Sequence, residues 1–436
     1  MSSKLVSPLT GAASGFPEYT PAQQRAFEAA VAIIKGVYES FGFTPLETSA
    51  VEKLDTLESK GISAKEVYGI RRLNVAEGED GGKDLALRFD LTVPTARYVV
   101  ANQGALTFPF RRYQVQPVWR GERAQAGRYR QFYQFDIDTI GDGSLPLVAD
   151  AEVLAAGFKA LEALGVGDFT MRINNRKLLQ GLLEWAGLGA HQQAAIKLID
   201  DAEKVGWDKT ADGLRDLNGK AKVSQLVELL QGAGPDELGE LDLNGDGKLG
   251  LDELTEVMNL ATRMVGKSNA ELKVDLTIAR GLDYYTGTVV ETTLHGAPEL
   301  GSIMSGGRYE DLAASLGKKK MPGVGISIGL SRLMAYLLSL HHYAKLAAAP
   351  ADVLVAVADE DALPAMAELA QKLRDVGVKA ELAFPAKGLG QQLQAAEKRG
   401  LQWAVVGMEG DKLKLRNFAS RADTLVALAD VKAAIQ

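Results

Sequence analysis

The chain has 436 residues, a formal net charge of −7 and no cysteine, which excludes disulfide bonds, thiolate catalysis and zinc sites built on cysteine. Its histidines show no zinc-binding spacing, the N-terminal segment MSSKLVSPLTG has no apolar run typical of a signal peptide, and no apolar stretch is long enough to span a bilayer. We therefore expect a cytoplasmic protein of two or three domains that does not enter a membrane.

The first part of the chain predicts a helix followed by strands. Thr20 and Gln23 can form a capping box with Pro21 at the first helical position, so a helix should run from there to about Ser40. Strand-like segments then lead to a β-hairpin within residues 112–141. The other elements predicted here are the strand Leu85–Leu91, the helix Ala149–Leu164 and the strand Phe169–Ile173.

Residues 175–266 predict helices and loops, as an all-α insertion between two parts of a strand-rich domain. Strands return after it, and beyond an alanine-rich linker at residues 345–351 strands alternate with helices, which predicts a small parallel or mixed sheet. The fold class expected is therefore α/β (α+β). The expected domain bounds are 1–174 and 267–345 for two parts of one domain, 175–266 for the insertion and 346–436 for the last domain.

The hairpin carries polar residues along one face of both strands, because side chains alternate between the two faces. Arg and Gln gather on the first strand, and Gln and Asp on the second. Such a face favours a binding floor for a small, polar, anion-bearing ligand, whereas the alternative is an exposed hairpin with a basic turn. The residues on this face are Arg112, Gln114, Gln116, Arg120, Phe132, Gln134, Asp136 and Asp138.

The segment Gly323–Gly329 predicts a strand with glycine at alternate positions. The missing side chains on one face allow a flat ligand to lie against the backbone, although tight packing is the alternative. Arg332 follows in the first turn of a helix, where the helix dipole favours phosphate. This combination favours a nucleotide site.

Four sequence blocks stand in a fixed order: Leu87–Tyr98 (LRFDLTVPTARY), Arg112–Gly141, Ala279–Glu291 (ARGLDYYTGTVVE) and Gly306–Leu333. Together they resemble motifs of the histidyl-tRNA synthetases, a family of class II aminoacyl-tRNA synthetases, and the resemblance extends over nearly the whole chain. It implies a class II catalytic domain on an antiparallel sheet, an α-helical insertion and a C-terminal α/β anticodon-binding domain.

The resemblance implies that the chain activates L-histidine with ATP, supplied with Mg²⁺, and transfers it to tRNA(His). Arg120 would hold the α-phosphate and the substrate carboxylate, and Arg280 would reach the α-phosphate from the opposite side, so both are predicted catalytic residues. Phe132 would stack on adenine, and Glu122 would contact adenine or order the loop. Arg128 and Arg332 would bind the outer phosphates.

The resemblance also implies a pocket for the histidine side chain. Asp138 and Tyr285 would read the two ring nitrogens. Asp90 would bind the α-ammonium group, unless it is only a turn or cap acid. The other residues predicted to bind histidine are Thr92, Gln134, Arg280 and Tyr284.

One motif in the helical region is not implied by the family. Residues 242–253 match a calcium-binding EF-hand loop at its ligand positions, including the turn residue Gly247. The alternative is a polar loop that matches by chance. The expected Ca²⁺ ligands are Asp242, Asn244, Asp246, Lys248 and Glu253.

Family motif 1 usually has a proline at the dimer interface, where this chain has Ser49; we still expect a homodimer. The rival function is a non-catalytic relative, the regulatory subunit of ATP phosphoribosyltransferase, which typically lacks the catalytic arginines and the anticodon domain. Arg120, Arg280 and Arg332 favour the enzyme, whose partners would be tRNA(His), L-histidine and ATP.

Overall fold

The computed structural model describes residues 11–58, 64–74, 84–123, 127–232, 234–278, 285–310, 319–340, 343, 348–384 and 387–435. The chain divides into two compact units, Met1–Pro17 with Ala30–Leu337, and Glu18–Ala29 with Leu338–Gln436. Among the described residues, no helix has both the length and the apolar character needed to cross a membrane.

Helix α1 (Pro21–Ser40) begins where the sequence predicts. The Thr20 hydroxyl accepts the Gln23 backbone N–H at 3.4 Å, and the Gln23 side chain accepts the Thr20 N–H at 3.0 Å. The capping box is therefore confirmed. In the first unit, Tyr38 of this helix packs edge-on against Phe135, with ring centroids 5.3 Å apart.

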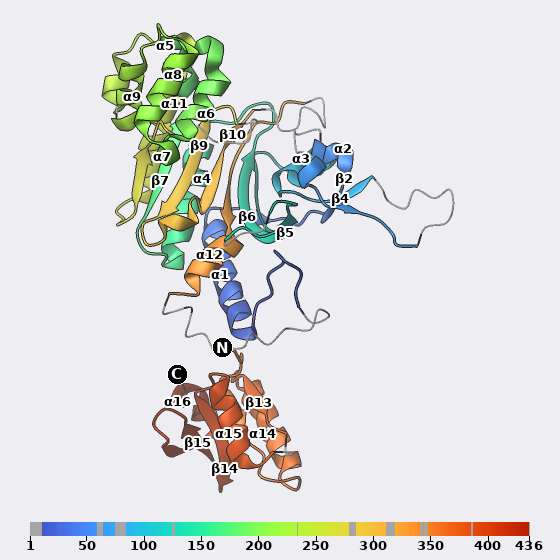
Figure 1. The fold of residues 1–436 in the computed structure, drawn as a ribbon. Coiled ribbons are helices and arrows are strands. Elements are labelled where there is room, and N and C mark those ends of the chain that lie inside the picture. Colours follow the sequence, from blue (N-terminus) through green and yellow to red (C-terminus); the bar gives the residue numbers. More distant parts are fainter. Residues whose placement is uncertain are drawn as a thin grey trace, which may run out of the picture. The chain divides into compact units, whose positions relative to one another are not determined.

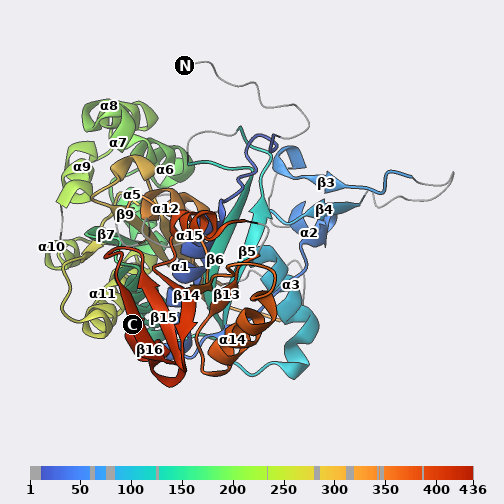
Figure 2. The ribbon, with the colours of Figure 1, turned by 90° about the horizontal axis from the view of Figure 1, so that it is seen from below.

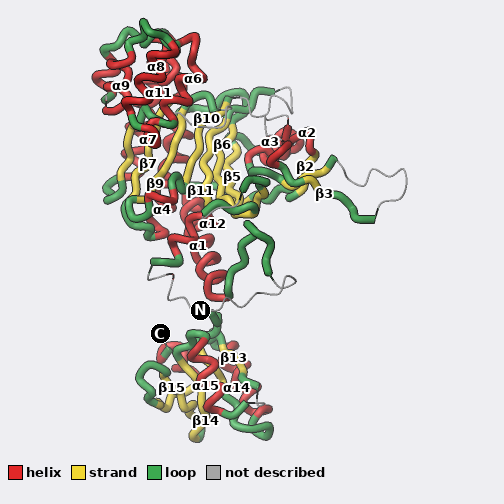
Figure 3. Tube along the Cα trace, viewed as in Figure 1, coloured by secondary structure: helices red, strands yellow, loops and turns green. Residues whose placement is uncertain are grey.

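An eight-stranded sheet forms the centre of the first unit, and Figure 3 shows its strands in yellow. The inner strands pair antiparallel, whereas the outermost pair at each end is parallel. This antiparallel-rich sheet confirms the predicted fold class. In order across the sheet, the strands are β1 (Thr44–Pro45), β5 (Phe110–Trp119), β6 (Gln131–Ile140), β11 (Gly323–Gly329), β10 (Met304–Tyr309), β9 (Thr288–Leu294), β7 (Phe169–Asn175) and β8 (Glu271–Val274).

Helices α4 (Val148–Leu164) and α12 (Leu330–Leu337) pack on strands β6 and β11. Most side chains of helix α4 are buried, and the helix packs against both the sheet and α11 (Gly245–Val265). Gly157 sets how closely it approaches, because a Cβ there would lie 2.2 Å from Cδ1 of Ile326. The helix ends at Gly165, whose φ of 65° is left-handed, as expected for a C-terminal glycine.

A small three-stranded sheet lies beside β5, as Figures 1 and 2 show. The fully buried side chain of Arg88 joins it to the large sheet, donating to the carbonyls of Thr48 and Pro117 at 2.9 Å each. The elements of this region are β2 (Val51–Lys53), α2 (Leu54–Glu58), η1 (Ala64–Glu66), β3 (Gly69–Ile70), β4 (Leu85–Leu87), α3 (Thr92–Asn102) and η2 (Gln103–Ala105).

Between β7 and β8 the described residues form helices, which gather at one end of the large sheet in Figure 1. The first of them starts directly after β7, because the Asn175 side chain accepts the Lys177 N–H at 2.9 Å and caps it. They are α5 (Arg176–Trp185), η3 (Gly189–His191), α6 (Gln192–Asp200), α7 (Ala202–Val205), α8 (Trp207–Leu217), α9 (Val223–Gly232), α10 (Pro235–Gly239) and α11 (Gly245–Val265).

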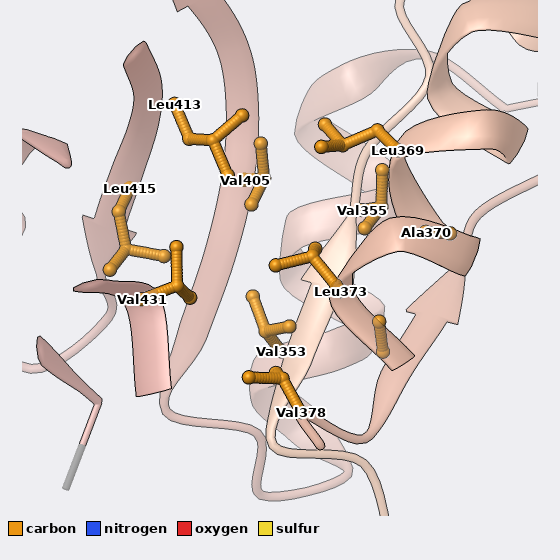
Figure 4. Close-up of a cluster of buried hydrophobic side chains, with 11 residues drawn as sticks. Val353, Val355, Leu369, Ala370, Leu373, Val378, Val405, Leu413, Leu415 and Val431 are labelled. Carbon is orange, nitrogen blue, oxygen red and sulfur yellow. The ribbon is translucent and has the colours of Figure 1, made fainter. Parts of the chain in front are cut away.

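The second unit contains a five-stranded mixed sheet in the order β13-β12-β14-β15-β16. The pairs of β12 with β13 and with β14 are parallel, and the last two pairs are antiparallel. Figure 4 shows the apolar core between this sheet and helix α14, including Val355, Leu373 and Val405. The elements are β12 (Val353–Val355), α14 (Leu363–Asp375), β13 (Ala380–Leu382), α15 (Leu389–Lys398), β14 (Trp403–Glu409), β15 (Lys412–Asn417), β16 (Asp423–Ala427), η5 (Leu428–Asp430) and α16 (Val431–Ala434).

Candidate active site

The polar face of the β5–β6 hairpin is buried. Arg112 stands opposite Asp138 and Gln116 opposite Gln134, and the side chains of Arg112, Gln134 and Asp138 are 0%, 8% and 4% exposed. An exposed hairpin, the alternative suggested by the sequence, is therefore wrong. Buried polar groups of this kind need partners from the protein or from a ligand.

A pocket of about 410 Å³ opens over this face, within the size range of small-molecule sites. Among the described residues, it brings together those predicted from the sequence to bind the nucleotide; their roles stay predictions, and Arg280 lies outside the described residues. Its lining includes Arg120, Glu122, Arg128, Phe132, Gln134, Ser302, Ser305, Ser327, Gly329 and Arg332.

Arg120 lies just beyond the end of β5 between two aromatic rings. Its guanidinium carbon is 5.0 Å from the ring centre of Phe132 and 4.5 Å from that of Phe89, and its Nε donates to the Phe89 carbonyl at 3.3 Å. These contacts hold the charged group in place while the aromatic rings give it no counter-charge. A guanidinium held in this way is suited to a phosphate or carboxylate ligand.

Positive charge accumulates at the other end of the pocket. Arg332, in the first turn of α12, donates to the carbonyls of Gly127 and Ser302 at 3.1 Å each. Burial and the charges of Arg128 and Arg120 lower its pKa. Glu122 accepts a hydrogen bond from Arg128 at 2.6 Å, and this bond lowers the pKa of the Glu122 carboxyl. Cations that repel one another in this way favour a polyanionic ligand.

Asp138 is the centre of a second, more buried part of the site. Its Oδ2 forms an ion pair with Arg112, and its Oδ1 accepts the hydroxyl of Tyr309 at 3.1 Å. Burial raises the pKa of Asp138 to about 6, although the Arg112 charge opposes the shift. Two residues along the same strand, burial likewise raises the pKa of Asp136 to about 7.

The remaining predicted histidine-binding residues lie around these carboxylates where they are described. Asp90 is buried, and its Oδ1 accepts the Val93 N–H at 3.0 Å in the first turn of α3, which Thr92 begins. Tyr285 packs against Tyr309. Two predicted residues, Arg280 and Tyr284, lie outside the described residues.

The two parts of the site meet at Gln134. Its amide donates to the Ser327 hydroxyl at 2.8 Å, and both residues also line the arginine-rich pocket. Within the described part of the chain, buried polar atoms without a hydrogen-bond partner include Gln134 Oε1, Asp136 Oδ1 and Arg112 Nε. Such atoms are rare in folded proteins, and here they are free to bind a ligand or water.

Residues 15–333 match the family model described as Histidyl-tRNA synthetase, and residues 352–436 match that of the Anticodon binding domain. The chain belongs to the histidyl-tRNA synthetase family. The chain is 40% identical to the histidine–tRNA ligase of Trichormus variabilis, with 96% of each chain covered. The corresponding ligase of Stenotrophomonas maltophilia is 41% identical, with 91% of this chain and 90% of the relative covered. A crystal structure of the histidyl-tRNA synthetase from Nostoc superposes with a TM-score of 0.86 at 37% identity, with 98% of each chain covered.

Histidyl-tRNA synthetases act on an amino acid and a nucleotide together, and the arrangement here has a corresponding division. The arginine-rich pocket suits phosphates, and the buried carboxylates suit a small cationic or N–H-donating group.

The calcium-binding loop predicted from the sequence is not formed, and this expectation is corrected. Helix α11 begins at Gly245, so the last part of the predicted loop is helical, and Asn244 caps it by accepting the Gly247 N–H at 2.6 Å. Glu253 instead bonds Lys177 at 2.5 Å and Asn175 at 2.9 Å. Across the described residues, no group of three or more His, Cys, Asp or Glu is gathered for a metal ion.

The glycines of the same motif have a packing role. A Cβ on Gly181 of α5 would lie 2.4 Å from the Gly247 Cα, and one on Gly250 would lie 2.3 Å from the Leu178 backbone nitrogen. Helices α5 and α11 can therefore approach closely only because these positions carry glycine. In this structure the residues that match an EF-hand loop form a helix cap followed by close-packing glycines.

Sequence reasoning missed two side chains of the site, Tyr309 and Ser327. Tyr309 follows Arg308 in the block GGRYEDL, and its ring also packs so close to Gly323 that a Cβ there would lie 2.4 Å away. The signal for Ser327 was its position between glycines on the strand predicted to face a ligand. Both residues reach the site only because β10 and β11 pair next to β6, a strand order that local patterns do not specify.

Proposed function

We propose that the protein activates L-histidine with ATP to give histidyl-adenylate and pyrophosphate, and then transfers the histidyl group to the terminal ribose of tRNA(His). The observation that carries this proposal is the junction at Gln134 between an arginine-rich pocket and a buried carboxylate face. Membership of the histidyl-tRNA synthetase family supports the same reaction.

In the proposed first step, a carboxylate oxygen of histidine attacks the α-phosphorus of ATP, a bond to that phosphorus forms, and pyrophosphate leaves with the electrons of the broken bond. The step needs alignment and neutralisation of charge more than a general base. Arg120 would bind the α-phosphate and the carboxylate, and Arg280 would approach from the other side. Phe132 would stack on adenine, as its place in the pocket beneath Arg120 supports.

The outer phosphates would contact the cationic end of the pocket. Arg332 and Arg128 lie there with Glu122, which orders Arg128 through their hydrogen bond. Magnesium would arrive on the nucleotide as part of the substrate. Charge from the two arginines would then stabilise the departing pyrophosphate.

Histidine would be oriented by its two polar ends. The α-ammonium group would be bound by Asp90 and Gln134 with Thr92 at the start of α3, and the two imidazole ring nitrogens would be read by Asp138 with Tyr285. The depth of Asp138 below the surface supports selectivity, because a buried acceptor left without its donor strongly disfavours analogues that lack the N–H. The family resemblance adds Tyr284 to this pocket.

We further propose the division 1–174 and 267–345 for the catalytic domain, 175–266 for the helical insertion and 346–436 for the anticodon-binding domain. The match of residues 352–436 to an anticodon-binding model supports the last of these. A cytoplasmic homodimer is the proposed working form, and light scattering of the purified chain tests the dimer.

ATP–pyrophosphate exchange with each of the twenty amino acids tests the proposed activation step. Exchange with histidine alone is the expected result, and exchange with another amino acid contradicts the pocket assignment. Histidine binding without any exchange would instead favour the regulatory subunit of ATP phosphoribosyltransferase. Charging of tRNA(His) transcripts with labelled histidine tests the second step.

A further inference from the structure

Arg112 is a cation at the base of the site that has no contact with solvent. It is 0% exposed and faces Asp138 directly across the β5–β6 ladder, where their charged groups form an ion pair. Its NH1 donates to Gln114 at 3.5 Å, and the Gln114 amide is held in turn by the Thr48 hydroxyl at 2.8 Å. The guanidinium is therefore held both by Asp138 and by the Gln114–Thr48 pair.

The charges around Arg112 give it a function beyond packing. The Arg112 charge acts on three buried carboxylates, Asp90, Asp136 and Asp138. It lowers the pKa of each one, whereas burial raises it. The tyrosines near Asp138 do not supply a positive charge in its place. The Tyr309 hydroxyl from β10, which bonds Asp138, is neutral, and Tyr285 influences Tyr309. Arg120 acts on Asp90 from the pocket side.

We propose that Arg112 is a positioning residue for amino-acid recognition, which keeps Asp138 ionised and oriented so that it accepts the N–H of a neutral imidazole. This inference rests on the proposed histidine pocket. If Asp138 kept its proton, its O–H would face the ring N–H, and two donors that face each other cannot form a hydrogen bond. An ionised Asp138 without Arg112 would favour the imidazolium form. The ion pair, neutral as a whole, selects the uncharged ring.

The test measures the KM for histidine in ATP–pyrophosphate exchange, from about pH 6 to about pH 9, for the wild type and for Arg112→Met. Dividing the variant KM by the wild-type KM at each pH removes the ionisation of free histidine. This KM ratio is expected to be largest at low pH, where Asp138 of the variant is protonated. It should fall by about tenfold per pH unit until the pH reaches the pKa of Asp138 in the variant. The KM for ATP should stay within a few-fold of wild type, and Arg112→Lys should restore a nearly flat ratio.

A matched control is Arg308→Gln. Arg308 forms another buried ion pair of the same unit, with Asp150 at 2.7 Å, and its side chain leaves β10 on the face opposite to that of its neighbour Tyr309. This variant should melt at a lower temperature without a pH-dependent KM ratio. A KM ratio for Arg112→Met that is raised equally at every pH would overturn the proposal and leave Arg112 a packing residue.

A second measurement needs no variant and holds even if Arg112→Met does not fold. Calorimetric titration of the wild type with histidine in two buffers of different ionisation enthalpy reports protons exchanged on binding. Near pH 7.5 the proposal expects no proton uptake, since Asp138 is already ionised and the bound ring is neutral, as free imidazole is above about pH 6.5. Uptake of about one proton, which binding of an imidazolium ring would require, overturns it.

Asp138→Asn separates this inference from the proposed function. If its KM for histidine equals that of the wild type, Asp138 does not read the ring and the pocket assignment itself fails. If the KM rises while the Arg112→Met ratio is independent of pH, the pocket assignment stands and only the role of Arg112 fails.

Discussion

The amide of Gln134 and the hydroxyl of Ser327 form a 2.8 Å hydrogen bond between neighbouring strands β6 and β11, at the border of the two parts of the site. The bond fixes which way the Gln134 side chain points, and its Oε1 has no hydrogen-bond partner among the described residues. Gln134 therefore presents an acceptor to a ligand in an orientation that Ser327 determines.

We predict that Ser327→Ala raises the KM for histidine by about threefold to tenfold, because Gln134 and Asp136 each lose a hydrogen bond to the Ser327 hydroxyl. Exchange kinetics at saturating ATP measure it. Ser305→Ala is the control, because Ser305 lies opposite Ser327 on β10 and lines the same pocket but is not the acceptor of Gln134. Equal changes in both variants would mean that the Gln134–Ser327 bond has no part in binding histidine.

Arg120→Ala should slow adenylate formation by roughly two to three orders of magnitude, the scale for one lost transition-state charge contact. The reason is the proposed contact with the α-phosphate, made from a guanidinium that already lies between two aromatic rings. Rapid-quench single-turnover measurements give the rate. Arg123→Ala removes an exposed arginine of the same loop and should stay within a few-fold of wild type; similar losses in both would point to general attraction of the anion.

Asp136→Asn should change the pH dependence of stability. Burial raises the pKa of Asp136 from 3.8 to about 7, so the folded state binds this proton more tightly than the unfolded state does. Wild-type stability from this group therefore falls as pH rises between those two values and is level above them. In thermal unfolding scans, the melting temperature of the variant should rise relative to that of the wild type as the pH increases across this window. A difference in melting temperature that does not vary with pH would contradict the pKa shift.

Leu373→Ala should destabilise the second unit by about 2–5 kcal/mol, because Leu373 is fully buried in the core that Figure 4 shows. We expect loss of tRNA charging at temperatures where histidine-dependent exchange remains. Leu425→Ala, at a position 43% exposed in the same sheet, should leave both activities in place. Parallel loss of exchange and charging in Leu373→Ala would show that activation depends on the second unit.

Gly250→Ala should cost about 1–3 kcal/mol of stability, since the new methyl group would meet the Leu178 backbone. Gly245→Ala, where nothing lies within 4 Å of the added Cβ, should be neutral or stabilising. Chemical denaturation compares the two variants. Calorimetry with millimolar Ca²⁺ should give no binding heat, and a measured heat abolished by Glu253→Gln would restore the EF-hand interpretation.

Much of the local structure could be predicted because it depends on neighbours in sequence. The capping box of Thr20 and Gln23, the two-faced hairpin and the alternating elements of the second unit all follow from short-range patterns. The strand order of the large sheet could not, since pairing of β6 with β11 joins segments far apart in the chain.

The EF-hand match shows the limit of motif reading. A loop and a helix start use the same residue types, because Asn at a cap and Asp in a first turn also satisfy free N–H groups and the helix dipole. Only the position of α5 decides between them, since it requires glycine at Gly247 and Gly250 and supplies Lys177 to Glu253. The polar face of the hairpin could be predicted from the alternation of residues along each strand. The pairing of Arg112 with Asp138 could not, because it depends on the register between the two strands.

The parallel pairing of β7 with β8 explains why the sheet can carry so large a helical segment. Two adjacent parallel strands cannot be joined by a tight turn, so the chain must return across the sheet by a crossover of a dozen residues or more. Helices α5 to α11 occupy that obligatory connection, and α11 contacts β7 and α4 along it. The crossover can therefore lengthen, shorten or change its helices in the course of evolution without altering the register of any strand that carries the active site.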